Sequence, residues 1–475
     1  MGRGSKHGSK ARTLKTQRTP IATSVSSARK LRFEISPNPA FVDEHVRIFA
    51  AGLRPLERVV IRAVTEDDEN RRWRSHAEFR ADETGCVDVS AMESRGGVYR
   101  GVSPMGLFWS MRLEDAHANG RTVFEKIGAS PNRVLLELVI GGRIVASAQL
   151  DRNFLMPGTE VRDLNIGDES GDTHSQSDGQ SSSHVGRLFL PPGRGPHPVV
   201  IVLSGTGGGF DLDKAALLSR HGFATLALAY FGIPPLPTWL HRIPLDYFEA
   251  ALAWLSAQPE VDLERVGVLG VSRGAELALL LGTKFPQIRA IVAYAPSSVA
   301  WAAGGRDKAT GEIIPSWTWR GEPVPFAPLP LRGFMLRSAF PVAVARRPVM
   351  FRNLFQAGLR NREAIARAAI PVEQIRGPLL LVSGGDDHLW PAAKMCEAIL
   401  GRLTDRHFAH AVEYLNYPRA GHMLRYPFLP TTSRQSRNKH LRNARFSFGG
   451  TPAADAEANA DSWRRAIAFL RSSLR

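Results

Sequence analysis

Cysteine is nearly absent from this chain of 475 residues. Only Cys86 and Cys396 are present, far apart in the sequence and in unlike surroundings. A disulfide-stapled fold needs several cysteines, and a cysteine-rich zinc site needs them in closely spaced pairs. The composition therefore argues against both classes. We expect no disulfide framework, no metal ion, and a reducing, cytoplasmic location.

Long hydrophobic runs are also missing. Apolar stretches such as Val199–Leu203 and Leu379–Val382 are only four or five residues long. A helix that crosses a bilayer needs about 20 consecutive apolar residues. We therefore expect no integral membrane segment, and these short runs are predicted to be buried β-strands.

Acidic residues are missing from the first thirty positions. That stretch carries eight lysines and arginines, and without them the formal charge of +16 would fall to +8. It lacks the apolar segment of a secretory signal, so residues 1–30 are predicted to be a basic, disordered tail. A transit peptide is the alternative, which leaves organelle targeting open. The remaining arginines are scattered, and we expect no nucleic-acid partner.

Short alternating apolar segments follow the tail over residues 31–160. Arg58–Asp67, "RVVIRAVTED", is one example, and Asn132–Leu150 contains Gly141-Gly142 between two β-rich halves. Period-2 alternation is typical of strands, and a Gly-Gly pair between two of them indicates a hairpin. The pattern predicts an all-β, sandwich-like domain.

A segment without apolar residues ends this pattern. Residues 167–184 read "GDESGDTHSQSDGQSSSH", which predicts a low-complexity loop or linker over 161–185. From 186 to 475, strands rich in Val, Ile and Leu alternate with helices, which predicts a mostly parallel sheet covered on both faces. The alternation is lost around 298–376, where proline is abundant. We expect an insertion there, over the ends of the sheet.

The segment "GVSRG", Gly270–Gly274, lies between an apolar strand and a helical stretch. This arrangement is typical of a nucleophile elbow, in which flanking glycines permit a sharp turn that exposes the serine hydroxyl. The motif alone is a weak signal, because a tight glycine-rich turn without chemistry has the same letters. With strand and helix on either side, it makes Ser272 the candidate nucleophile.

A serine nucleophile needs a histidine to take its proton and a carboxylate to orient that histidine. Asp387 follows the strand "PLLLVSG", and His422 follows "VEYLNY". The order Ser, Asp, His is that of α/β-hydrolases. Asp386 stays open as the alternative acid, and His388 is expected to hydrogen-bond locally.

An oxyanion hole supplies backbone N–H groups where negative charge develops. One donor is expected to be the amide of Arg273, directly after the nucleophile. The second should come from "SGTGGGF", which follows the strand "VVIVL". Gly207 is the preferred donor and Gly208 the second choice. A phosphate-binding loop is disfavoured because no lysine-containing P-loop motif is present.

Several longer motifs occur in a fixed order along the chain: "ISPNPAFVDEHVRI", "GVSPMGLFWSMR", "GTGGG", "GVSRGAELAL", "GGDDHLW", "YPRAGHML" and "FGGTPAADAEANADSWRRAIAFL". In these motifs the chain resembles the acyl-CoA thioesterases related to bile acid-CoA:amino acid N-acyltransferase. The resemblance implies an N-terminal β-sandwich, an α/β-hydrolase catalytic domain and an acyl-CoA substrate. It also implies that Ser272, Asp387 and His422 form the catalytic triad. The basic leader, the Ser/Gln-rich loop and the Arg/Pro-rich insertion depart from the family pattern.

The resemblance bears on the reaction as well. Family members that conjugate acyl groups to amino acids carry cysteine where this chain has Ser272. An acyl-cysteine is a thioester that partitions well to amine attack, whereas an acyl-serine ester with a histidine-activated water favours hydrolysis. We therefore expect an acyl-CoA thioester hydrolase without a cofactor. The alternatives are an N-acyltransferase, a dienelactone-hydrolase-like carboxylesterase, and a binding protein of hydrolase fold without catalysis.

Overall fold

The computed structural model describes residues 1–2, 30–114, 123–165, 184–331, 333–334, 348–438 and 444–475. The predicted basic tail lies outside the described residues except at positions 1, 2 and 30. None of the helices in these ranges is long and apolar enough to cross a bilayer.

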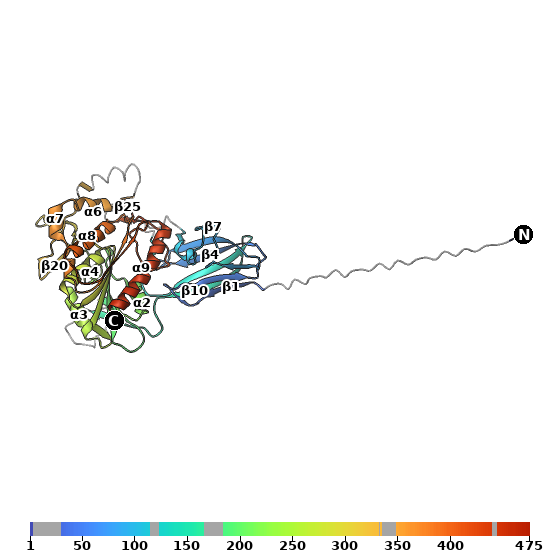
Figure 1. The fold of residues 1–475 in the computed structure, drawn as a ribbon, viewed down its shortest axis with the longest axis horizontal. Coiled ribbons are helices and arrows are strands. Elements are labelled where there is room, and N and C mark those ends of the chain that lie inside the picture. Colours follow the sequence, from blue (N-terminus) through green and yellow to red (C-terminus); the bar gives the residue numbers. More distant parts are fainter. Residues whose placement is uncertain (3–29, 115–122, 166–183, 332, 335–347, 439–443) are drawn as a thin grey trace, which may run out of the picture.

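An eight-stranded sheet forms the centre of the C-terminal part of the chain (Figure 1). Its strands, in spatial order, are β11 (Glu160–Asn165), β12 (His184–Leu190), β14 (Ala224–Leu228), β13 (His197–Leu203), β16 (Val261–Val271), β17 (Ile288–Tyr294), β22 (Leu379–Gly384) and β23 (Val412–Tyr417). Strand β12 runs antiparallel to both of its neighbours, and all other pairs are parallel. This is the strand order of the α/β-hydrolase fold, as predicted.

Helices cover both faces of this sheet. On one face lie α3 (Tyr247–Ser256), α4 (Arg273–Lys284) and α8 (Ala392–Asp405), and on the other lie α2 (Leu212–Ser219) and α9 (Pro452–Ser473). The central strands are apolar on both sides because both sides are buried. All six residues of β22 are buried, for example.

The predicted linker over 161–185 is wrong at its beginning. Residues 160–165 form β11, which is hydrogen-bonded to β12 along its whole length, and residues 166–183 lie outside the described part. Strand β11 is at the edge of the sheet, and most of its side chains are not fully buried. A strand in that position needs no apolar run, so "EVRDLN" gave no strand signal in the sequence.

Between β17 and β22 the alternation of strand and helix is interrupted, in the region where the insertion is predicted. The described residues there form the short strands β18 (Ala302–Arg306), β19 (Ile313–Pro315), β20 (Trp317–Trp319) and β21 (Glu322–Pro323), the helices α6 (Arg352–Gly358) and α7 (Arg362–Ala368), and the 3-10 turn η1 (Val372–Gln374). Strand β20 also pairs with β15 (Ile243–Pro244). After β23, the strands β24 (Gln435–Asn438) and β25 (Ala444–Ser447) form an antiparallel pair.

The N-terminal residues form two further sheets. Three strands make the smaller one: β1 (Arg32–Ser36), β3 (Arg47–Ala51) and β6 (Cys86–Asp88). The larger holds β2 (Ala40–Phe41), β10 (Arg143–Asn153), β9 (Asn132–Ile140), β4 (Arg58–Glu66), β5 (Arg72–Arg80) and β7 (Gly96–Gly97), with β8 (Arg112–Leu113) also on β5, and a short helix, α1 (Gly106–Trp109), lies nearby. The hairpin predicted at Gly141-Gly142 is confirmed, and both glycines have positive φ, 56° and 83°.

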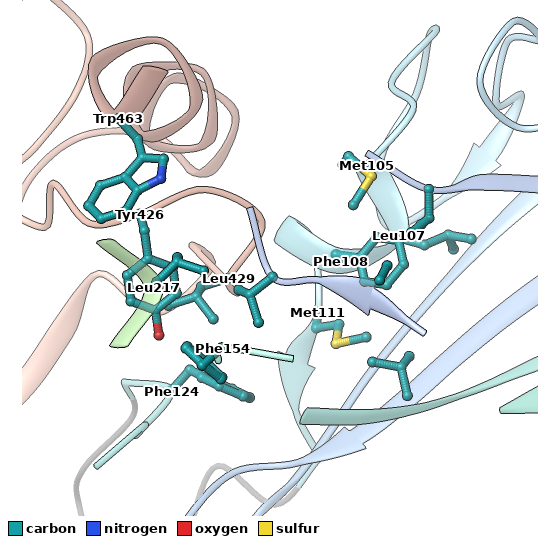
Figure 2. Packing of buried hydrophobic residues seen from close by; sticks show 14 of the residues in the cluster. Met105, Leu107, Phe108, Met111, Phe124, Phe154, Leu217, Tyr426, Leu429 and Trp463 are labelled. Atoms are coloured by element: carbon teal, nitrogen blue, oxygen red, sulfur yellow. The ribbon is translucent and has the colours of Figure 1, made fainter. Parts of the chain in front are cut away.

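The N-terminal strands and the eight-stranded sheet of the C-terminal part share one apolar core. Figure 2 shows Phe124 and Phe154 from the N-terminal part against Tyr426 and Leu429 from the C-terminal part. The rings of Phe154 and Tyr426 meet edge to face, with centroids 5.8 Å apart. The shared core fixes the N-terminal strands on the side of the sheet that α2 and α9 cover.

Polar contacts of the buried Asp43 side chain, which we call the Asp43 clasp, add to this apolar contact. Asp43 contacts His221 Nε2 at 2.7 Å, accepts from the indole of Trp463 on α9 at 3.0 Å, and pairs with Arg220. Burial alone would raise the pKa of Asp43. The hydrogen bond and charge of His221, with Arg220 and Trp463, outweigh burial and hold the pKa below its usual value. The stability from this clasp is therefore present above the ordinary aspartate pKa and is lost as the pH falls through the lowered value.

We expect Asp43→Ala to lower the free energy of unfolding by about 3 kcal/mol, because it leaves the partly buried Arg220 without its counter-charge and removes the hydrogen-bond partner of Trp463. Glu34→Ala is the matched control, since Glu34 pairs with Arg32 where both side chains are more than half exposed. The control should stay within about 0.5 kcal/mol of the wild type. Urea denaturation at pH 7.5 measures both variants, and equal loss in the two would contradict the role of the clasp.

Candidate active site

Ser272 stands in the sharp turn between β16 and α4. Its φ of 58° lies in the left-handed region, which is strained for a residue with a side chain. The amide of Ser272 donates to the carbonyl of Tyr294 on β17 at 2.8 Å. The predicted elbow is therefore present, with the serine at the carboxyl end of a central strand.

Close backbone packing holds this turn in place. A Cβ atom on Gly270 would lie 2.1 Å from the carbonyl oxygen of Gly274, and one on Gly274 would lie 2.3 Å from the carbonyl oxygen of Ser204. Real Cβ contacts are never this short, so neither site accepts a side chain without moving backbone. Glycine is therefore required on both sides of Ser272, because a side chain at either position would collide with neighbouring backbone.

Helix α4 begins directly after the serine, at Arg273. The first amides of a helix have no carbonyl partner within it and carry partial positive charge. The Arg273 amide is therefore beside Ser272 and outside the helix ladder, as an oxyanion donor requires.

The side chain of Arg273 turns away into a buried ion pair. Its guanidinium bonds Glu276 at 2.8 Å, and Glu276 in turn accepts from the backbone amide of Trp301 at 3.1 Å and the indole of Trp317 at 2.7 Å. Burial raises the pKa of Glu276, against the opposing charge of Arg273. Trp301 and Trp317 both belong to the insertion, so the Arg273–Glu276 pair connects helix α4 to the insertion.

His422 and Asp387 lie in direct contact. His422 Nδ1 and Asp387 Oδ2 are 2.6 Å apart, and both residues are buried. The other oxygen of Asp387 accepts from the amides of Leu389 and Trp390, at 2.7 and 3.1 Å. Since Nδ1 faces the carboxylate, Nε2 is the ring nitrogen left for a proton from a nucleophile.

The second candidate acid, Asp386, has other partners. It contacts His388 Nε2 at 3.0 Å and accepts from the amide of Gly450 at 3.0 Å. The other nitrogen of His388 contacts the hydroxyl of Ser447 at 2.9 Å. His388 is thus engaged locally, and of the two neighbouring aspartates it is Asp387 that the structure brings to His422.

The glycine-rich loop after β13 reaches Ser272 through a residue that the sequence analysis did not single out. A Cβ on Gly205 would lie 3.4 Å from Ser272 Cβ and 4.0 Å from its Oγ. A Cβ atom on Gly207, the expected donor, would meet nothing within 4 Å. The second choice, Gly208, is wrong, because its amide already donates to the carbonyl of Gly205 at 3.2 Å. All the loop glycines look alike in sequence, and only the path of the loop distinguishes Gly205.

Trp390 was also missed by the sequence analysis. Its ring meets that of His422 edge to face, with centroids 6.1 Å apart, and it contacts Phe355 of the insertion on its other side, at 5.5 Å. A tryptophan after an acidic loop carries no signal of its own. Its contact with His422 comes from the tertiary fold.

The site offers no clear place for a metal ion. Within the described ranges, no group of three or more His, Cys, Asp or Glu side chains is arranged to hold one. Cys396 is buried, which raises the pKa of its thiol and keeps it protonated.

Comparison with known families gives two matches. Residues 243–475 match the model described as "BAAT / Acyl-CoA thioester hydrolase C terminal". Residues 43–166 match "Acyl-CoA thioester hydrolase/BAAT N-terminal region". The two matches follow each other along the chain and cover most of the described residues.

Three relatives are similar over nearly their whole length. Peroxisomal succinyl-coenzyme A thioesterase of Mus musculus is 31% identical, over 91% of this chain and 94% of that protein. Acyl-coenzyme A amino acid N-acyltransferase 1 of Mus musculus is 31% identical, over 92% and 97%. Acyl-coenzyme A thioesterase 1 of Homo sapiens is 30% identical, over 91% and 94%. Since one relative is named as peroxisomal and another thioesterase as mitochondrial, these names do not support the expected cytoplasmic location.

Among solved structures, an acylaminoacyl peptidase from Pyrococcus horikoshii is similar at 12% identity and a TM-score of 0.41. The match covers 91% of this chain and 60% of that one. At this TM-score the likeness adds nothing to the strand order described above.

The packing of the elbow predicts the effect of one added methyl group. Gly274→Ala should reduce the rate at which a fluorophosphonate probe labels Ser272 by at least about tenfold, because the new Cβ pushes the turn away from the loop at Ser204. Gly401→Ala, in the middle of α8 where a Cβ meets nothing within 4 Å, is the control. It should keep the labelling rate and gain about 0.5–1 kcal/mol of stability. Unchanged labelling of Gly274→Ala would contradict this account of the turn.

Proposed function

The chain belongs to the family of acyl-CoA thioester hydrolases and bile acid-CoA:amino acid N-acyltransferases, and from that premise we propose that it hydrolyses acyl-CoA thioesters. The products are a free carboxylic acid and CoA. The proposal narrows the family's two reactions, hydrolysis and acyl transfer, to one.

The observation that carries the proposal is the serine at the elbow. Both reactions pass through an acyl-enzyme, so the choice between them depends on what attacks that intermediate. A thioester on cysteine reacts readily with amines. An oxygen ester on Ser272 is less reactive toward an amine, and a water activated by His422 is its natural acceptor.

In the first half of the proposed reaction, Ser272 Oγ attacks the thioester carbonyl carbon and His422 Nε2 takes the hydroxyl proton. Asp387 holds the Nδ1–H and stabilises the positive charge that the imidazole gains. The tetrahedral intermediate then collapses, the C–S bond breaks, and His422 gives its proton to the CoA sulfur. The acyl group remains on Ser272 as an ester.

In the second half, His422 takes a proton from water and the resulting hydroxide attacks the ester carbonyl. The C–O bond to Ser272 breaks, and His422 returns the proton to the serine oxygen. The carboxylic acid leaves, and the enzyme is in its starting state.

Backbone amides stabilise the oxyanion in both halves. We assign this role to the amide of Arg273 at the first position of α4 and keep Gly207 as the proposed second donor. A single such donor is worth about 10²–10³ in kcat in other enzymes. The proximity of Gly205 to Ser272 supports a donor from this loop.

We further propose that residues 31–160 act as a sandwich-like domain that supports the catalytic part. Two sheets, antiparallel except for the short β2–β10 pair, and the regular alternation of buried and exposed residues in β4 and β5 support this proposal. The shared core and the Asp43 clasp give it a fixed position on α2 and α9. Its role is then structural, since the proposed triad lies entirely beyond residue 186.

The direct test is release of CoA thiol from a panel of acyl-CoAs of different chain length, with and without glycine or taurine. We expect thiol release and free acid with at least one chain length, and no conjugate by mass spectrometry. Ser272→Ala should lower kcat by a factor on the order of 10⁴ or more. No thiol release across the panel would contradict the proposal, and a dominant amide conjugate would assign the chain to acyl transfer.

The two neighbouring aspartates provide a matched pair of variants. Asp387→Asn keeps the shape of the side chain but favours the wrong tautomer of His422, so kcat should fall by a factor on the order of 10⁴. Asp386→Asn should lower kcat by less than about tenfold, because Asp386 contacts His388 and Gly450 instead. The reverse order of the two effects, measured as kcat on the best acyl-CoA, would make Asp386 the orienting acid.

A further inference from the structure

Helix α9 accepts hydrogen bonds from the His422 loop both before and after the histidine in the chain. Asp455 Oδ1 accepts a hydrogen bond from the amide of Gly421 at 2.7 Å, and Asn459 Oδ1 accepts one from the amide of Arg425 at 2.8 Å. The two side chains are one helical turn apart and face the same way. His422 therefore stands on a segment whose backbone is clamped just before and just after it.

Asp455 is the member of this clamp that carries charge. It is buried, only 4% exposed, and lies beside a cavity of about 20 Å³ that Arg425, Arg434 and Asn459 also line. Asp386 and Asp387 act on it from the loop after β22. Three carboxyl groups and two imidazoles, those of His422 and of His388 on Asp386, thus gather around the loop, with Arg434 and Arg425 as the nearby cations.

The balance of these groups favours a neutral Asp455 at low pH. Burial, joined by the charges of Asp386 and Asp387, raises the pKa of Asp455 to about 7, although the Gly421 amide and Arg434 act in the opposite direction. This value is far above that of an ordinary aspartate. The carboxyl group therefore ionises near neutral pH.

A carboxylate at this buried position lowers the stability of the fold when it is ionised. An asparagine could accept the same hydrogen bond from Gly421 without placing a charge in a buried site, as Asn459 does for Arg425. Since the folded state binds the proton more tightly than the unfolded state, ionised Asp455 lowers stability as the pH rises through about 7. A group that is kept against stability points to a role in the site.

We propose that Asp455 is a positioning residue for His422, which fixes the His422 loop through the Gly421 amide and adds a second negative charge behind the Asp387–His422 pair. This inference rests on the role of His422 in the proposed function. Asp455 does not touch the substrate in this proposal and acts only through His422.

The negative charge of Asp455 favours one charge state of His422. Ionised Asp455 stabilises the imidazolium form of His422 by charge attraction, and removing the charge destabilises that form. The acidic limb of the activity profile, where protonated His422 cannot act as a base, should then move to lower pH.

The test compares Asp455→Asn, Asp455→Ala and the uncharged control Asn459→Ala in the full chain. Two rates are measured from pH 5 to 9: labelling of Ser272 by a fluorophosphonate, and turnover of the best acyl-CoA. For Asp455→Asn we expect the acidic limb to move down by about half a pH unit or more. Asp455→Ala should show the same shift and lose about tenfold in kcat with KM within about twofold. Asn459→Ala should lower kcat without moving the limb.

Melting temperatures give a second, independent readout. Asp455→Asn should raise the melting temperature more at pH 8 than at pH 5.5, because it removes a buried charge that is present mainly at the higher pH. An equal change at both values would contradict the ionisation of Asp455 near neutral pH. If Asp455→Ala does not fold, Asp455→Asn alone decides the question.

Either of two results would overturn the inference: a profile of Asp455→Asn that superimposes on the wild type, or an equal shift in Asn459→Ala, which would assign the effect to the loop rather than the charge. The labelling arm does not depend on the substrate. A wild-type protein that is labelled at Ser272 but releases no CoA would refute thioester hydrolysis, and the labelling profile would still test Asp455.

Discussion

Ser272 keeps its left-handed turn only because no side chain stands between three pieces of backbone. Gly270, Gly274 and the end of β13 at Ser204 approach so closely that a single Cβ would meet an oxygen at 2.1 or 2.3 Å. The strain of the turn is balanced by this packing and by the bond from Ser272 N–H to Tyr294. The proposed nucleophile is thereby held at the carboxyl end of the central strand β16.

Three further parts of the molecule position the elbow helix and the other proposed site residues. The insertion is tied to the elbow helix by the Arg273–Glu276 pair, the loop after β22 brings Asp387 to His422, and α9 clamps the histidine loop from behind. The N-terminal strands pack against α2 and α9. Their contribution runs through the position of α9, which connects the Asp43 clasp at Trp463 with Asp455 and Asn459 on the same helix.

Local signals in the sequence were sufficient for the elbow, the hairpin at Gly141-Gly142 and the parallel central strands, because each depends on neighbouring residues. The sequence named Asp387 as the acid and left Asp386 open, and the contact with His422 Nδ1 distinguishes the two. Three features could not be read in this way. Strand β11 has no apolar run because it is an edge strand, Gly205 is one glycine among several in its loop, and Asp455 lies 33 residues after His422 on a helix whose polar positions look like ordinary solvated ones.

The central claim is that the acyl group passes through an ester on Ser272. It is tested most directly by mixing the protein with an acyl-CoA substrate, quenching in acid within milliseconds to seconds, and locating the added mass by peptide mass spectrometry. The account predicts one acyl group per chain on the peptide that contains Ser272, in a linkage that alkali cleaves. CoA release that proceeds with no acyl group on Ser272, or with the group on another residue, would contradict it.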